Sequence, residues 1–198
     1  MRIIKKHYFI FAIILLISVL VSGCTTDGYQ KIVETKQGVK FSFECPTSYK
    51  NLTEPEDALS DFTFILIRPD GDLSWESWNV NTEFGIEIYT ADEEYDSAKS
   101  RLDDLLKSYS NLGSYHEFNL LERSKVEISG IEGELVVYTF RYFEIGTDML
   151  ASHLSMVREA YLDYQDQIWI IWVKSYSEST DQVKEEFDHI IKIFKFLN

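Results

Sequence analysis

The residue types that could do acid–base, nucleophilic or metal chemistry are few and widely spaced in this sequence. Beyond residue 23 there are three histidines, His116, His153 and His189, and no His-x-x-His or Cys-x-x-Cys pair that would hold zinc. No Gly-x-Ser-x-Gly turn presents a nucleophilic serine, and no glycine-rich loop could cradle phosphate groups. The sequence therefore predicts no catalytic residue, no metal site and no cofactor, and we expect His189 to have a structural role.

One run of oxygen-bearing side chains is similar to the start of a calcium-binding loop. Asp70 opens this run, in which every second residue up to position 76 carries a side-chain oxygen. The sixth loop position, which needs glycine for a sharp turn, is Trp75, and the twelfth, which needs a chelating glutamate, is Asn81. We therefore expect a polar turn between strands. A weak divalent-cation site on the acidic runs 54–57 and 92–94 is the alternative.

Three further side chains could act outside a catalytic site. Trp75 and Trp78 lie in a predicted loop, where aromatic rings can stack on sugars or grip a partner protein, so they form a candidate contact surface. Partial burial over the sheet is the alternative for both. Cys45 precedes Pro46 at the end of an apolar alternation and is expected to be a small buried hydrophobe, with a reactive or intermolecularly bridged thiol as the alternative.

The first 24 residues have the pattern of an export signal. Basic residues at positions 2, 5 and 6 precede about fourteen apolar residues, whereas a bilayer span needs roughly 20. The segment ends in residues 20–24, Leu-Val-Ser-Gly-Cys, which resemble the lipobox of bacterial and archaeal lipoprotein signals. In those signals the cysteine thiol, here Cys24, receives a diacylglycerol before cleavage. A plain membrane anchor helix with an incidental cysteine is the alternative.

This signal predicts the organisation and location of the protein. Residues 1–23 are the expected lipoprotein signal peptide, 24–29 the lipidated tether and 30–198 one globular domain. Lipid on Cys24 would hold that domain on the extracytoplasmic face of the cell membrane. Residues 1–23 carry three of the 19 basic residues and none of the 33 acidic ones, so the net charge changes from −14 to −17 on processing. This charge excludes nucleic acid as an expected partner.

Two-residue alternation predicts a series of half-buried strands. Apolar residues alternate with polar ones from Val39 to Phe43 and again over 84–88, and 62–67 is a β-prone apolar run. Four more β-like segments cover about 117–125, 133–143, 153–164 and 168–176. The last two should form an antiparallel hairpin around residues 164–167. On the final strand Trp169 and Trp172 fall on opposite faces, so one is expected in the core and the other under a helix.

Apolar residues at three- and four-residue steps predict two helices. The first is expected to open with a capping box formed by Thr90 and Glu93 and to stop at Gly113. The second opens at about 179–182 and carries Phe187 and Phe194 on one face, and the chain is expected to end on it. Because strands and helices occur in separate runs, we predict an α+β fold in which an antiparallel β-sheet is sandwiched by α-helices.

The predicted order of elements resembles the PsbP-like family. The features that carry the resemblance are the strand at 38–43 followed by Pro46, the acid-capped helix after 86–88, the hairpin with Gly130 and Gly133, the aromatic strand at 168–176 and the terminal helix through 187–196. The family includes the extrinsic subunit of photosystem II and a yeast Ran-binding protein, and its fold is an antiparallel sheet sandwiched by helices. The resemblance covers about residues 38–197. It implies no enzyme, but a domain that docks on larger assemblies or binds small ligands.

Together these features predict a lipid-anchored extracytoplasmic binding or assembly module without catalytic activity. Its expected partners are the membrane, through the lipid on Cys24, and a membrane-protein assembly. Two alternatives stay open. One is a surface lipoprotein that captures a small ligand, which would need a sizeable pocket at the sheet–helix boundary. The other is a divalent-metal-dependent surface hydrolase, which would need polar side chains and at least two carboxylates clustered in one deep pocket.

Overall fold

A computed structural model describes residues 28–51, 63–68, 82–92, 95–111, 116–145, 150–175 and 180–197. Cys24, Trp75, Trp78 and the Asp70 run lie outside these residues. The described chain is an α+β fold with a seven-stranded and a three-stranded antiparallel sheet. No helix in these residues is long and apolar enough to cross a membrane.

The large sheet has the strand order β3-β4-β5-β9-β8-β7-β6. Its strands are β3 (Lys50–Asn51), β4 (Thr63–Arg68), β5 (Thr82–Thr90), β6 (His116–Ile128), β7 (Ile131–Ile145), β8 (Leu150–Tyr164) and β9 (Gln167–Ser175). Every neighbouring pair is antiparallel. The pairing of β5 with β9 joins the two halves of the sheet from segments about 80 residues apart in the chain.

Tight turns connect the long strands. Ser129 and Gly130 both have positive φ at the β6–β7 turn, and so do Gln165 and Asp166 at the β8–β9 turn. Two positive φ values in a two-residue loop are the geometry that matches the twist of antiparallel strands. The β8–β9 hairpin is thus confirmed at the position that the sequence predicts.

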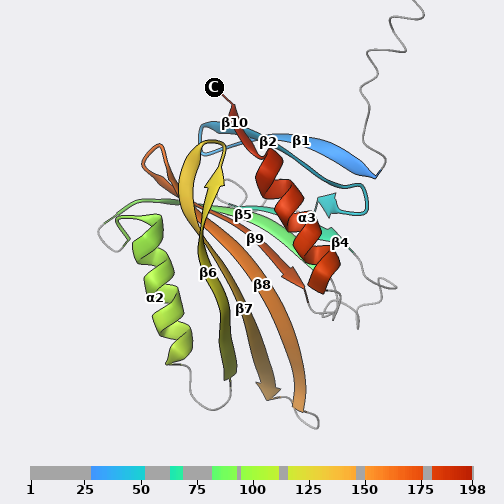
Figure 1. Ribbon diagram of the computed structural model, residues 1–198, viewed down its shortest axis with the longest axis vertical. Helices are drawn as coiled ribbons and strands as arrows, with labels where there is room; N and C mark the ends of the chain where they lie inside the picture. The colour runs from blue at the N-terminus through green and yellow to red at the C-terminus, as the bar shows by residue number, and fades with distance from the viewer. Residues whose placement is uncertain are drawn as a thin grey trace, which may run out of the picture.

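Different elements cover the two faces of the large sheet. Helix α2 (Ala98–Ser110) packs on one face, against β7, β8 and β9. The small sheet, in the order β1-β2-β10, and helix α3 (Thr180–Ile193) pack on the other. The small sheet consists of β1 (Tyr29–Lys36), β2 (Val39–Pro46) and β10 (Lys195–Leu197). In Figure 1 the long strands β6, β7 and β8 pass between the two helices.

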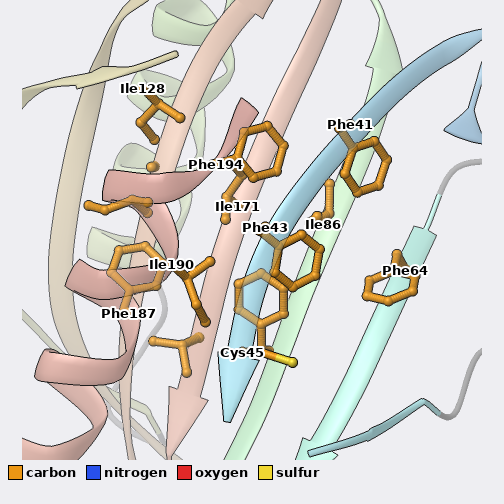
Figure 2. Close-up of a cluster of buried hydrophobic side chains, with 14 of the residues drawn as sticks. Phe41, Phe43, Cys45, Phe64, Ile86, Ile128, Ile171, Phe187, Ile190 and Phe194 are labelled. Carbon is orange, nitrogen blue, oxygen red and sulfur yellow. The ribbon is translucent and has the colours of Figure 1, made fainter. Parts of the chain in front are cut away.

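The main hydrophobic core lies between the large sheet, the small sheet and α3. Phe41 and Phe43 from β2 stack on Phe194, with ring centroids 5.6 and 6.2 Å apart. Figure 2 shows these rings together with Phe187 and Ile190, which come from α3, and Cys45 below Phe43. Cys45 is fully buried and burial raises the pKa of its thiol to about 11, so the prediction of a small buried hydrophobe is confirmed.

Two predictions about element boundaries were wrong, and one strand was missed. Helix α2 begins at Ala98 with Ser97 as its N-cap, because Ser97 and Ser100 form the capping box, while Thr90 still belongs to β5. The chain does not end on α3, since β10 follows it and pairs with β2. Strand β1 was not predicted, because its exposed edge position leaves it without a strong apolar alternation.

Candidate functional site

A groove lies between α2 and the large sheet and is the candidate functional site. It consists of two adjoining cavities of about 380 and 280 Å³ that share Glu87, Tyr109, Glu159 and Trp172. These volumes lie near the lower end of the range for small-molecule sites, about 300–1,000 Å³. Other residues that line the groove are Glu83, Tyr95, Arg101, Asp104, Leu105, Ser108, Tyr138, Phe140, Ser155, Val157, Tyr161, Ile170 and Lys174.

Strand register brings the floor of the groove together. Side chains of every second residue on a strand share a face, so Glu83, Gly85 and Glu87 of β5 all face α2. Gly85 pairs with Trp172 on β9, and Trp172 pairs with Glu159 on β8. Gly85, Trp172 and Glu159 therefore lie in one row across β5, β9 and β8.

Gly85 is required for this arrangement because it leaves room for the indole of Trp172. A Cβ atom at position 85 would lie 2.3 Å from two carbon atoms of the indole ring. The ring therefore lies directly over the β5 backbone at Gly85, the residue midway between Glu83 and Glu87 in the chain. Its nitrogen is buried and has no hydrogen-bond partner in the described residues. The prediction that the two tryptophans lie on opposite faces, one in the core and one under a helix, is confirmed, and the structure places Trp169 in the core and Trp172 under α2.

Glu159 is the central acidic residue of the groove. The hydroxyl of Tyr138 donates to its Oε1 at 3.1 Å, and the hydroxyl of Tyr161 donates to its Oε2 at 2.8 Å. Burial raises the pKa of Glu159 to about 7, with a smaller contribution from the charge of Glu87, while the two tyrosines and Arg101 oppose the rise. This carboxyl group therefore changes its charge near neutral pH.

On the α2 side of the groove, Arg101 packs on two aromatic rings. The guanidinium of Arg101 lies 3.5 Å from the ring centroid of Tyr89 and 4.9 Å from that of Tyr95. Tyr89 donates a hydrogen bond to Glu87, and burial raises the pKa of Tyr89 to about 12. Tyr89 therefore contacts Arg101 through its ring and Glu87 through its hydroxyl.

The second cavity contains an acid–base pair on neighbouring strands. Glu83 pairs in register with Lys174, and both line the cavity. Burial raises the pKa of Glu83, and the positive charge of Lys174 opposes that rise. The positive charge of Lys174 therefore partly offsets the negative charge of Glu83 within the groove.

Polar contacts at both ends of α2 fix the helix over the groove. The Ala98 N–H, in the first turn, donates to Asp163 Oδ1 on β8 at 2.7 Å, where the helix dipole also favours a negative charge. Farther along the helix, Asp103 binds Arg123 of β6 at 2.7 Å, and Arg123 also binds Glu134 of β7 at 2.6 Å. Tyr109, in the last turn, packs against Tyr138 of β7.

A second buried polar cluster lies on the opposite face of the large sheet. Arg68 forms an ion pair with Glu186 of α3 and also donates to Thr82 at 3.1 Å. Tyr49 and Gln182 donate to the same carboxylate at 3.0 and 2.8 Å. Because protein groups occupy both oxygens of Glu186, we assign this cluster a structural role.

The structure does not describe the residues that the sequence predicts as sites. Cys24, Trp75 and Trp78 lie outside the described residues, so their roles stay predictions. His189 contacts the ring of Tyr29 and lies 3.7 Å from Glu44, and no group of three metal-ligating side chains is found in the described chain. Sequence reasoning missed the groove. The signal was present as charged residues, Glu83, Glu87 and Lys174, at alternate positions of two otherwise apolar central strands.

Comparison with solved structures identifies the fold. LpqN of Mycobacterium tuberculosis, described as involved in cell envelope biogenesis, aligns with a TM-score of 0.52 at 10% identity, over 86% of this chain and 92% of its own. Cyanobacterial PsbP (CyanoP) from Synechocystis sp. PCC 6803 aligns at 0.50 and 14% identity, over 90% and 99%. The Saccharomyces cerevisiae Ran-binding protein Mog1p aligns at 0.50 and 11%, over 83% and 96%. The chain has the PsbP-like fold.

Comparison of sequences finds no relative of this chain beyond these structural neighbours. No protein-family description matches the chain, and no curated protein is similar to it in sequence. A Bacteroides thetaiotaomicron structure aligns at a TM-score of 0.48 and 12% identity, and this chain spans about half of it, 48%. The PsbP-like fold is therefore established by structure, which confirms the resemblance in the order of elements.

Proposed function

We propose that the protein is a lipid-anchored binding or assembly module on the extracytoplasmic face of the cell membrane, that it has no catalytic activity, and that the groove under α2 is its binding site. The observation that carries this proposal is the groove itself, which combines two adjoining cavities, aromatic walls and a largely buried carboxyl group. Concave sites of this kind, with a few polar groups among aromatic side chains, are typical of binding.

The fold neighbours support a binding role. Mog1p is named for binding Ran, and LpqN is described as involved in cell envelope biogenesis. By analogy of fold, this protein would act by association with another molecule at the cell envelope. Its acidic surface makes nucleic acid an unsuitable partner.

The proposed anchor would hold the start of the domain close to the membrane. Cys24 is five residues before Tyr29, the first residue of β1. Even fully extended, five residues span at most roughly 17 Å. The domain would therefore bind its ligand or partner while tethered at the membrane surface, and a contact through Trp75 and Trp78 would add to the same assembly.

Hydrolysis is the second candidate function, because two carboxyl groups face one cavity. Glu87 and Glu159 both line the groove, and burial holds the pKa of Glu159 at about 7, which suits a general acid or base. The binding role is favoured because tyrosine hydroxyls already occupy both oxygens of Glu159, and Tyr89 already donates to Glu87. A purified protein that turns over a glycoside or ester, with loss of activity in Glu159→Gln, would establish hydrolysis instead.

Site-specific photocrosslinking in intact membranes tests the proposed function. A benzophenone amino acid at Ser108 would face the groove, and the same amino acid at exposed Lys107, next to it on α2, would not. We expect a discrete adduct from position 108 that is absent from position 107. Cys24→Ala should release the protein from the membrane and abolish the adduct. Equal labelling from both positions, or a Cys24→Ala variant that stays membrane-bound, would contradict the proposal.

A further inference from the structure

More acidic than basic side chains line the groove. Four carboxylates line its two cavities, Glu83, Glu87, Asp104 and Glu159, against two cations, Arg101 and Lys174. Lys174 lies opposite Glu83, and Arg101 lies on the rings of Tyr89 and Tyr95. Within the described residues neither Glu87 nor Glu159 forms an ion pair. The groove therefore has an excess of negative charge at its centre, where the two cavities meet.

The walls beside these two carboxylates are aromatic. Trp172 and Tyr109 line both cavities together with Glu87 and Glu159. A ring face attracts a cation within about 6 Å of its centroid, and the attraction is strongest for tryptophan. Arg101 shows that this groove accepts such a contact, since its guanidinium lies 3.5 Å from the centroid of Tyr89. Carboxylates and aromatic rings that line the same groove are the combination that suits an organic cation.

We propose that the groove binds an alkylammonium or guanidinium group, held by Glu159 and Glu87 between the rings of Trp172 and Tyr109. This proposal rests on the proposed function, because it names the ligand class of the same groove. Anions are excluded by the excess of carboxylates.

Binding of a cation at this position must be linked to a proton. Glu159 has to be ionised to attract the ligand, and burial keeps its pKa at about 7. The other groups that face it are Glu87 from β5, Arg101 from α2 and the hydroxyls of Tyr138 and Tyr161 from β7 and β8. Affinity should therefore rise with pH as Glu159 loses its proton, by roughly tenfold between pH 6 and pH 8.

Calorimetric titration of the full-length chain in detergent micelles tests the proposal. The probes are pentane-1,5-diamine, its neutral isostere pentane-1,5-diol and the anion glutarate. Nα-acetyl-lysine methylamide represents a lysine side chain of a partner protein. We expect the diamine to bind and the diol and glutarate not to bind. Tighter binding of the diamine would indicate a free amine as the ligand, and tighter binding of the lysine amide would indicate a side chain of a partner.

Variants locate the binding within the groove. Glu159→Gln keeps a hydrogen-bond acceptor for the tyrosines and should weaken diamine binding by at least about tenfold, equivalent to about 1.4 kcal/mol, and remove its pH dependence. Glu132→Gln, a matched change at an exposed carboxylate on β7, should leave binding unchanged. Thermal unfolding of both variants confirms that they are folded.

The outcomes separate this proposal from the proposed function. Binding of the diol as tight as that of the diamine, or unchanged binding and pH profile in Glu159→Gln, would overturn the cation proposal. If no cation binds while the Ser108 photoadduct still forms in membranes, the groove is a binding site for another class of ligand and only the present proposal fails. If both experiments are negative, the proposed function fails as well.

Discussion

The two faces of the large sheet are built from the same strands but carry different kinds of side chain. Toward α3, strands β5 and β9 present Phe84, Ile86, Trp169 and Ile171, all fully buried in one apolar core. Toward α2, the alternate residues of the same strands include Glu83, Glu87, Trp172 and Lys174, which line a groove. One face maximises apolar burial, and the other keeps polar groups at a sheet–helix boundary. The comparison indicates that the α3 face holds the larger apolar core, whereas the α2 face combines a smaller apolar core with the candidate site.

The largest expected difference between the faces is in their response to removal of an aromatic ring. Phe43→Ala empties a space in the closely packed core and should lower the free energy of unfolding by about 3–5 kcal/mol. Tyr109→Ala, on the groove face, should lower it by about 1–2 kcal/mol, because Tyr109 is partly exposed. Urea denaturation measures both. Equal losses would show that the α2 face is as important for stability as the core.

The buried charges of the two faces should also differ in their effects. Glu186→Gln removes the negative charge beside Arg68 in the α3-side core and should cost about 3 kcal/mol, because the buried guanidinium loses this ion pair. The control is Asp188→Asn, an exposed position on the same helix, which should change stability by less than about 0.5 kcal/mol. A small effect of Glu186→Gln in denaturation experiments would mean that the ion pair contributes little.

Replacing the carboxyl group in the groove should stabilise the folded protein, whereas replacing Glu186 should destabilise it. The pKa of Glu159 is raised from 4.5 to about 7, so the folded protein binds this proton more tightly than the unfolded chain. Stability is therefore lost as pH rises from about 4.5 to about 7, and the full loss applies above that range. Glu159→Gln should be more stable than the natural protein by up to roughly 3 kcal/mol at pH 8, with the difference disappearing near pH 4. Parallel stability curves of the two proteins from pH 4 to pH 8 would contradict this account.

The smallest expected effect concerns the fit of Trp172 over β5. Gly85→Ala places a Cβ where the indole lies and should cost about 1–3 kcal/mol through overpacking. The same change in a Trp172→Ala background should cost less, because the clashing ring is absent. A double-mutant cycle measured by thermal unfolding gives this coupling. A coupling of zero would show that the indole can lie elsewhere without cost.

Much of the fold could be predicted from local patterns. The β8–β9 hairpin, the apolar face of α3 and the opposite placement of Trp169 and Trp172 follow from periods of 2 and 3.6 residues. The start of α2 was predicted seven residues too early, because Thr90 and Glu93 offer a capping box as plausible in sequence as that of Ser97 and Ser100. Strands β1 and β10 were missed, since edge pairing to β2 stabilises them more than their own composition does.

The groove could not be predicted in the same way. Glu83 and Glu87 read as the solvated side of a half-buried strand, and Glu159 reads as a polar position within an apolar strand. Their proximity depends on the pairing of β5 with β9 and of β9 with β8, which joins residues more than 70 positions apart. The predicted contact residues, Trp75 and Trp78, lie outside the described chain and cannot be compared with it.

The sequence by itself determined which residues alternate, where turns occur, the excess of acidic residues and the expected lipid attachment at Cys24, because each depends on neighbours in the chain. Only the tertiary structure decided that the indole of Trp172 lies over Gly85, that two tyrosine hydroxyls meet at Glu159 and that burial raises the pKa of that carboxyl group to about 7. Strand register and the position of α2 set the distance between these groups and their access to water, and both quantities arise from contacts between segments far apart in sequence.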